Sequence, residues 1–176
     1  YRKGFEDENS GDLFFETLRI IKAKQPEIIF LENVKNLVGH DDGKTFRIIT
    51  DALEQNGYQI KYQVLNAKDF GNIPQNRERI YIVGFKKEEY YQKFEFPFPI
   101  DLTKSIHDML EKNVTDENFF YSQDKNVFYE ELKNNMLNEN SIYQWRRKYV
   151  RENKSNVCPT LTANMGAGGH NVPLIL

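Results

Sequence analysis

The sequence is poor in the residues and patterns that mark secreted, membrane-spanning and metal-binding proteins. A single cysteine, Cys158, excludes an internal disulfide framework and is compatible with a reducing cytoplasm. No run of about 18 apolar residues is present, so we expect no transmembrane helix. The polar and acidic start of the chain is not typical of a signal peptide. His40, His107 and His170 lie far apart without ligand spacing, so we expect no metal site.

Net charge is also low, at −2, and gives no indication of a polyanionic partner. The charges are nevertheless unevenly placed. Between residues 142 and 176 the only acidic residue is Glu152, while the basic residues are Arg146, Arg147, Lys148, Arg151 and Lys154. A local basic cluster is the electrostatic footprint expected of nucleic-acid contact. A solvated surface can carry the same cluster, so charge alone leaves both interpretations open.

The first half of the chain has the alternating helix and strand patterns of an α/β fold. Hydrophobic periodicity predicts, in chain order, a helix over 14–21, a strand over 27–31, a helix over 46–53 and strands over 58–64 and 79–85. Because no helix separates the last two strands, we expect them to form an antiparallel pair at the edge of an otherwise parallel sheet. This half therefore indicates the later part of an open α/β sheet whose earlier strands are missing.

The pattern changes after residue 86. Phe94–Pro99 combines aromatic residues with prolines and cannot lie inside a helix, so we interpret 91–100 as a linker. We expect an α/β domain over 1–90 and a small, mainly β or irregular domain over 101–176. Within the second domain the sequence predicts a short helix over 105–112 and strands over 148–150, 160–162 and 172–176 around a glycine loop at 165–171.

Glu32 is the first candidate for chemistry. It follows a predicted buried strand, and open α/β sheets place their ligands at the carboxyl ends of their strands. We expect a carboxyl group there to be partly desolvated, so that it could donate a proton or form a hydrogen bond to a ligand. Helix capping or a structural salt bridge would explain the same residue equally well.

Arg77 and Arg79 are the second candidates. Residues two apart at the start of a strand point to the same face, so both side chains could converge on one anionic or carbonyl-bearing ligand. The alternative is that one or both pair with a nearby carboxylate such as Glu78.

The glycine loop is the third candidate. Its glycines allow a close backbone approach to a ligand, and Thr160, Thr162 and Asn164 supply uncharged donors for base edges or phosphates. A plain mobile turn is the alternative, and the spacing is not that of a nucleotide-phosphate loop. Cys158 is followed by Pro159 with no histidine beside it, so we interpret it as a small buried residue and not as a nucleophile.

These segments together resemble C5-cytosine-specific DNA methyltransferases of the bacterial restriction-modification type. Tyr1–Asp7 with Asp12–Glu16 resemble the segment after the catalytic Pro-Cys loop, and Phe30–Val34 resembles the Glu-Asn-Val motif. Asn66–Ile80 resembles the Gln-x-Arg-x-Arg motif. Cys158–Thr162 with the glycine loop resemble the Thr-Leu element of a target-recognition region. The match covers about 1–86 and 142–176. It implies part of a Rossmann-like methyltransferase sheet, with the C-terminal part of the catalytic domain over 1–90 and an incomplete target-recognition region over 101–176.

The resemblance also implies a mechanism, in which a cysteine attacks C6 of a flipped cytosine and S-adenosylmethionine donates a methyl group to C5. Glu32 would contact N3 and the exocyclic amine, Arg79 the base carbonyl, and Arg77 the active-site loops or the DNA backbone. The contacts to double-stranded DNA would come from Gln75, Arg146, Arg147, Lys148, Arg151, Lys154, Thr160, Asn164, Gly166, Gly168 and Gly169. The complete enzyme would be a monomer in the bacterial cytoplasm, with no membrane or metal partner.

The sequence departs from the family pattern in ways that argue against catalysis by this chain alone. The sequence has no Pro-Cys dipeptide, no glycine-rich cofactor loop and no closing motif. We therefore expect an internal fragment that is inactive alone, whose cofactor site lies largely outside it and which a complementing N-terminal fragment could complete. The alternatives are a non-catalytic, sequence-specific DNA-binding module, half of a split methyltransferase, and an unrelated α/β interaction domain.

Overall fold

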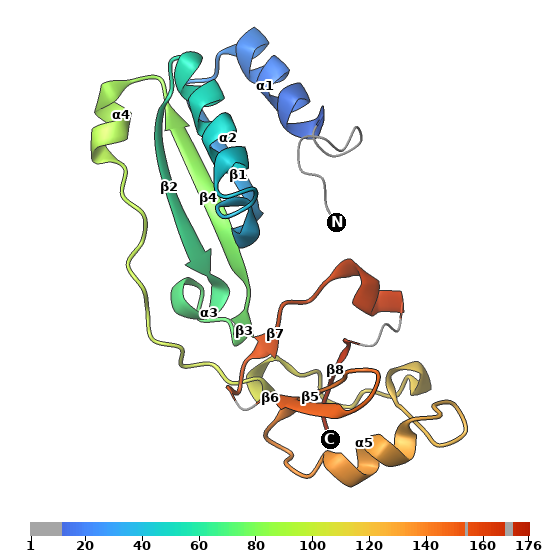
Figure 1. The fold of residues 1–176 in the computed structure, drawn as a ribbon. Helices are drawn as coiled ribbons and strands as arrows, with labels where there is room; N and C mark the ends of the chain where they lie inside the picture. Colours follow the sequence, from blue (N-terminus) through green and yellow to red (C-terminus); the bar gives the residue numbers. More distant parts are fainter. Residues whose placement is uncertain (1–11, 154, 168–170) are drawn as a thin grey trace. The chain divides into compact units, whose positions relative to one another are not determined.

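The computed structural model describes residues 12–153, 155–167 and 171–176, and the chain divides into two compact units (Figure 1). Unit 1 comprises the described parts of Tyr1–Leu65 together with Glu78–Phe98. Unit 2 comprises Asn66–Arg77 together with the described parts of Pro99–Leu176. Within the described residues, no helix has the length and apolar character needed to cross a bilayer.

Unit 1 is a small sheet with helices packed on it. Its elements are α1 (Asp12–Lys24), β1 (Ile28–Val34), the 3-10 turn η2 (Lys35–Leu37), α2 (Lys44–Gln55), β2 (Gln59–Asn66, whose last residue belongs to unit 2), β4 (Glu78–Phe85) and α4 (Glu88–Lys93). The two longer helices and the three strands confirm the elements that periodicity predicts. The short helix α4 was not expected.

The strand order of this sheet is β1-β4-β2. β4 pairs antiparallel with β1 in a register that runs from Ile28 opposite Phe85 to Val34 opposite Arg79, and Figure 1 draws β2 and β4 in opposite directions. β4 is thus next to β2, as expected, but it lies in the middle of the three strands and not at the edge. Its apolar run is buried over 82–85, as suits a central strand, whereas β2 alternates with polar residues and suits an edge.

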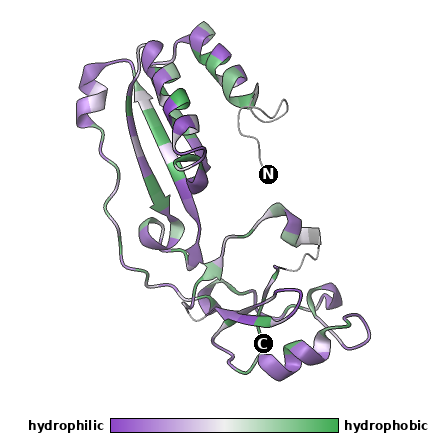
Figure 2. Ribbon diagram, in the orientation of Figure 1, coloured by the Kyte–Doolittle hydropathy of each residue, from purple (hydrophilic) through white to green (hydrophobic). Residues whose placement is uncertain are grey.

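The core of unit 1 lies between the helices and the sheet. Its buried residues are Leu18, Ile21, Ile29, Phe46, Ile49, Leu53, Tyr58, Ile80 and Ile82. Spacings of three and four bring the α2 residues onto one face, and Figure 2 shows hydrophobic colour on α2 and β4 against a largely hydrophilic α4. A Cβ at Gly84 would lie 2.6 Å from the Ile29 side chain, so this close packing requires glycine.

Unit 2 is built from much shorter elements. They are α3 (Ala67–Phe70), β3 (Gln75–Asn76), the 3-10 turns η3 (His107–Met109), η4 (Glu117–Phe119) and η5 (Ala163–Ala167), α5 (Tyr129–Asn135), β5 (Ile142–Trp145), β6 (Val150–Asn153), β7 (Cys158–Pro159) and β8 (Pro173–Leu174). β3 pairs parallel with β7, and a second sheet has the order β6-β5-β8 with antiparallel pairs. Its largest core cluster contains Leu132, Met136, Tyr143 and Leu174.

Several expectations for this region were wrong in detail. The helix expected over 105–112 is a single 3-10 turn, η3, and residues 160–162 do not form a strand. The helix α5 and the strand β5 were not predicted. Strands of two to four residues are too short to show a period of two, so sequence periodicity does not reveal them.

Candidate functional site

The structure brings Glu32 and Arg79 into contact within unit 1. Glu32 lies opposite Tyr81 and Arg79 opposite Val34, so the two side chains are diagonal neighbours on one face of the sheet. Arg79 Nε lies 2.9 Å from Glu32 Oε1, and Arg79 Nη1 donates to the carbonyl of Glu78 at 2.8 Å. The Arg79 side chain is 15% exposed, whereas that of Glu32 is 44% exposed. The arginine is therefore held in place, while the carboxylate remains open to a ligand.

The exposure of Glu32 differs from the partly desolvated position expected at a strand end. The cause is the place of β1, which forms one edge of the three described strands and so leaves its end accessible to solvent. Of the two explanations that the sequence left open, the salt bridge is present and helix capping is not, because η2 begins after Val34 with no side-chain cap. A salt bridge to a partly buried arginine is still compatible with ligand binding.

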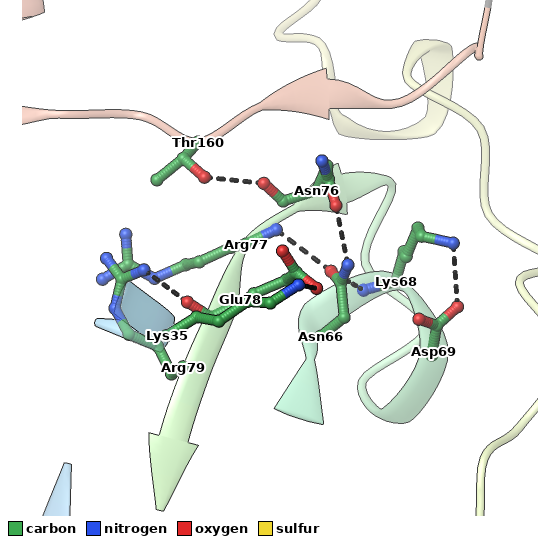
Figure 3. A network of polar contacts seen from close by, with 9 residues as sticks. All are labelled: Lys35, Asn66, Lys68, Asp69, Asn76, Arg77, Glu78, Arg79 and Thr160. Carbon is green, nitrogen blue, oxygen red and sulfur yellow. Dashed lines mark hydrogen bonds and ion pairs between the residues drawn. The ribbon is translucent and has the colours of Figure 1, made fainter. Parts of the chain in front are cut away.

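Glu78 forms a second ion pair and does not hold either arginine through its carboxylate. Its Oε1 lies 2.8 Å from Lys35 Nζ, and both side chains are partly exposed (Figure 3). Of the two arginines, Arg79 pairs with Glu32, and Arg77 has no carboxylate partner among the residues that the structure describes. The guanidinium of Arg77 thus remains available for another anion.

Residues 75–77 run between two other parts of unit 2. β3 pairs with β7 through Gln75 opposite Cys158, and the Cys158 amide donates to the Pro74 carbonyl at 2.7 Å. The Thr160 hydroxyl donates to the Asn76 carbonyl at 2.6 Å, as Figure 3 shows. Gln75 and Thr160, both expected to contact DNA, therefore lie on adjoining segments.

The basic cluster lies on the β5–β6 hairpin. Trp145 pairs with Val150, so Arg147 and Lys148 lie at the turn, and both are exposed. Arg147 has a φ of 69°, in the left-handed region, which allows the tight reversal. Arg146 donates to the Asn171 side chain at 2.9 Å.

The cations of this hairpin have no ion-pair partner in the part of the chain that the structure describes. In the described ranges no carboxylate lies within ion-pair distance of Arg146, Arg147, Lys148 or Arg151. Lys154 lies outside the described residues. Unpaired cations at an exposed turn are suited to a polyanion.

The segment after Thr160 is exposed and largely free of packing constraints. The Thr162 hydroxyl donates to Asn164 Oδ1 at 2.5 Å, and η5 follows. A Cβ at Gly166 would meet no atom within 4 Å, so the packing around it does not require glycine there. Gly168 and Gly169 lie outside the described residues.

Cys158 is half-buried, and burial raises the pKa of its thiol. A raised pKa disfavours the thiolate, which is the nucleophilic form. This agrees with its interpretation as a structural residue. The part of the chain that the structure describes also contains no cluster of histidine, cysteine, aspartate or glutamate suited to a metal ion.

Asn66 is a residue whose contacts the sequence did not predict. It is 8% exposed and caps α3, and its side chain contacts three other residues, Lys68, Asn76 and Arg77. The sequence did carry a signal, because asparagine after a strand and before a short helix is a preferred N-cap. Its contact with Arg77, eleven positions later, carries no sequence signal.

Comparison with known proteins gives a consistent result. Residues 1–174 match the family model described as C-5 cytosine-specific DNA methylase. The chain is 70% identical over 176 residues to the type II methyltransferase M.Bsp6I of Bacillus sp. (strain RFL6), covering 99% of this chain and 56% of that protein. It is 43% identical over 109 residues to M.HhaI of Haemophilus parahaemolyticus, covering 62% of this chain and 33% of that one.

Among solved structures, the methyltransferase EhMeth of Entamoeba histolytica matches with a TM-score of 0.53 and 25% identity, over 68% of this chain and 35% of that one. This match agrees with the expected fold class, part of a Rossmann-like α/β methyltransferase fold. The chain thus spans a third to a little over half of the length of these relatives.

Proposed function

This chain belongs to the C-5 cytosine-specific DNA methylase family, and from that premise we propose that the protein carrying it methylates C5 of cytosine at a specific site in duplex DNA. S-adenosylmethionine would be the methyl donor. The observation that supports the proposal most directly is the contact between Glu32 and Arg79 at 2.9 Å, in which the carboxylate stays accessible.

The pair matches the hydrogen-bonding edge of cytosine. That edge offers an amine donor, the ring nitrogen N3 and a carbonyl acceptor. A carboxylate can accept from the amine and from a protonated N3, while a guanidinium donates to the carbonyl. In the proposed mechanism Glu32 stabilises the proton at N3, which makes C6 more electrophilic, and Arg79 orients both the carboxylate and the base.

The nucleophile is not among these residues. Attack on C6 needs access to the ring face, so the base must leave the helical stack. The family places this attack on a Pro-Cys cysteine, and Cys158 precedes its proline and has a raised thiol pKa. We therefore propose that residues 1–176 alone do not transfer methyl groups, and that the remaining part of a complete family domain supplies the cysteine.

We also propose that the described residues do not complete a site for S-adenosylmethionine. The two strand ends that lead directly into helical turns, at Val34 and Asn66, carry no glycine-rich turn that would let a nucleotide approach the backbone. The cofactor supplies the methyl group when bound, and its site lies largely outside this chain in our proposal.

DNA contact is proposed for unit 2, as part of a target-recognition region that follows the catalytic part of the chain. Phosphates would meet the hairpin cations, and base edges would meet the segment after Thr160. The residues proposed to contact DNA are Gln75, Arg146, Arg147, Lys148, Arg151, Thr160, Asn164 and Gly166, with Lys154, Gly168 and Gly169 proposed from sequence alone. Arg77 is proposed to hold the active-site loops or to contact the DNA backbone. The complete protein would act as a monomer in the bacterial cytoplasm.

The test is transfer of a labelled methyl group to duplex DNA by the protein expressed from its complete coding frame. Glu32→Gln should lower turnover by more than tenfold, within the roughly 10²–10⁴-fold range of acid–base contributions. Glu27→Gln is a matched control, because Glu27 forms an ion pair with Lys87 at 2.5 Å beside the other end of the same strand pair. Equal turnover of the Glu32→Gln protein and wild type would remove the role proposed for Glu32.

A second candidate function is DNA binding without catalysis, and the unpaired hairpin cations favour it. Both strands of the hairpin, β5 and β6, lie wholly within the chain. Residues 1–176 alone, tested with a duplex library, should then select a sequence without methylating it. Binding that ignores sequence would argue against a recognition module.

A further inference from the structure

Asn66 is buried and makes more contacts than capping requires. It ends β2 and is the N-cap of the four-residue helix α3. Its Oδ1 accepts from the Lys68 amide at 3.4 Å and from the Arg77 amide at 3.0 Å, and its Nδ2 donates to Asn76 Oδ1 at 2.6 Å (Figure 3). A simple N-cap would explain only the contact with Lys68.

The backbone next to Asn66 adds to this attachment. The Ala67 amide donates to the Arg77 carbonyl at 3.0 Å. Both polar backbone groups of Arg77 are therefore bonded to residues 66 and 67. On the other side, the Thr160 hydroxyl and the Cys158 amide bond to the carbonyls of Asn76 and Pro74. Residues 75–77 are thus fixed from two sides, and on one side a single buried side chain makes two of the bonds.

We propose that Asn66 is a positioning residue, which fixes the backbone of residues 75–77 so that the side chains of Gln75 and Arg77 meet DNA in one preset direction. This inference rests on the proposed function. Asn66 itself would contact neither base nor phosphate. Its effect passes through Arg77, whose amide would lose its side-chain acceptor if Asn66 were shortened. The remaining contact of that amide, to the Gln75 carbonyl at 3.1 Å, joins residues only two apart, as in a γ-turn.

The experiment is a double-mutant cycle between Asn66 and Arg77 in the protein expressed from its complete coding frame. Asn66→Ala should lower kcat/KM for methyl transfer by about tenfold, because the part-buried Arg77 amide loses its side-chain acceptor. If the effect passes through Arg77, adding Asn66→Ala to the Arg77→Ala protein should lower kcat/KM by less than about threefold. If the role of Asn66 were purely structural, the loss of kcat/KM in the double mutant would equal the product of the losses in the two single mutants.

Two further variants separate positioning from folding. Asn66→Asp keeps an oxygen for the Lys68 and Arg77 amides, and the exposed Asn76 amide can turn to donate to it, so it should remain within about threefold of wild type. Asn138→Ala is a matched control, because Asn138 also accepts from the amide two residues later, at 3.0 Å, and its hydrogen bonds go to 140, 141 and 143 and not to 75–77. Its kcat/KM should match wild type.

Multiplying losses, or an Asn66→Ala protein with wild-type kcat/KM, would overturn the inference. Failure of the proposed function is recognised separately, as wild-type protein that transfers no methyl group. In that case the same four proteins are compared by their Kd for a duplex oligonucleotide. Coupled losses there support the inference, and independent losses overturn it.

Discussion

The two units hold their charged residues in different ways. Two ion pairs in unit 1 join β4 to neighbouring elements. Arg79 of β4 pairs with Glu32 of β1, and Glu78 of β4 pairs with Lys35 of the turn after β1. In unit 2, the hairpin cations have no carboxylate partner among the described residues. Paired charges over a packed sheet have a fixed geometry, as chemistry on a base requires. Unpaired exposed cations suit contacts that depend on charge more than on geometry.

Packing follows the same division. The core of unit 1 joins two helices to strands of seven and eight residues. Unit 2 has strands of two to four residues, and side-chain to backbone hydrogen bonds support its turns, such as those from the amides of Leu137 and Asn138 to the Tyr143 hydroxyl, the latter at 2.8 Å. We infer that unit 1 provides rigid positioning and unit 2 an adaptable binding surface.

The largest expected effect is on Arg79. Arg79→Ala removes the group that orients Glu32 and should lower kcat/KM by roughly 10²–10³-fold, as for loss of one preorganised donor. Lys35→Ala removes the neighbouring ion pair, whose side chains are 53% and 38% exposed, and should stay within about threefold. Steady-state kinetics on duplex DNA measures both, and equal losses would mean that the two pairs do not differ in role.

Next is the core of unit 1. Ile80 is fully buried, so Ile80→Ala should cost about 2–5 kcal/mol of unfolding free energy. Hydrogen exchange should accelerate in β1, β2 and β4 and remain unchanged in β5 and β6. Ile73→Ala serves as the control, because Ile73 is 47% exposed. Uniform acceleration across the chain would contradict the division into two units.

A smaller effect is expected at the hairpin. Replacing Arg147 and Lys148 together by alanine should raise the Kd for duplex DNA about tenfold at moderate salt and lower the slope of log K against log salt by about two. Lys133→Ala removes an exposed cation of α5 and should change neither quantity. Filter binding across a salt series distinguishes these results, and an unchanged slope would exclude phosphate contact by the hairpin.

The smallest effect concerns Cys158. Burial raises its thiol pKa, so the thiolate fraction at pH 8 is below that of an exposed cysteine and grows as the pH rises toward that pKa. Alkylation by iodoacetamide should therefore be slower than that of a cysteine peptide at pH 8. Cys158→Ser should change methyl transfer by less than about threefold. A large loss of turnover would restore Cys158 as a candidate nucleophile.

The long, periodic elements of the fold could be predicted from the sequence. Spacings along α2 and the apolar run of β4 predicted unit 1, because burial on one face leaves a regular pattern. The position of β4 between β1 and β2 was not predicted, since pairing partners are set by tertiary packing and not by local pattern.

The site was predicted only in part. Their positions at strand ends indicated Glu32 and Arg79 as candidates. Their mutual contact depends on the antiparallel register of β1 and β4. The expected desolvation of Glu32 was wrong for the described strands, because β1 lies at their edge. The bonds from Asn66 to Arg77 and from Thr160 to Asn76 join residues 11 and 84 positions apart, and no local signal encodes them.

The most direct test of the proposed function is to map the methylated atom. The protein expressed from its complete coding frame is incubated with S-adenosylmethionine and duplex DNA, and the product is analysed by bisulfite sequencing and nucleoside mass spectrometry. We predict 5-methylcytosine at one short duplex sequence, formed more than tenfold more slowly by the Glu32→Gln protein. Methylation at an exocyclic amine of adenine or cytosine, or 5-methylcytosine at the same level without Glu32, would contradict this prediction.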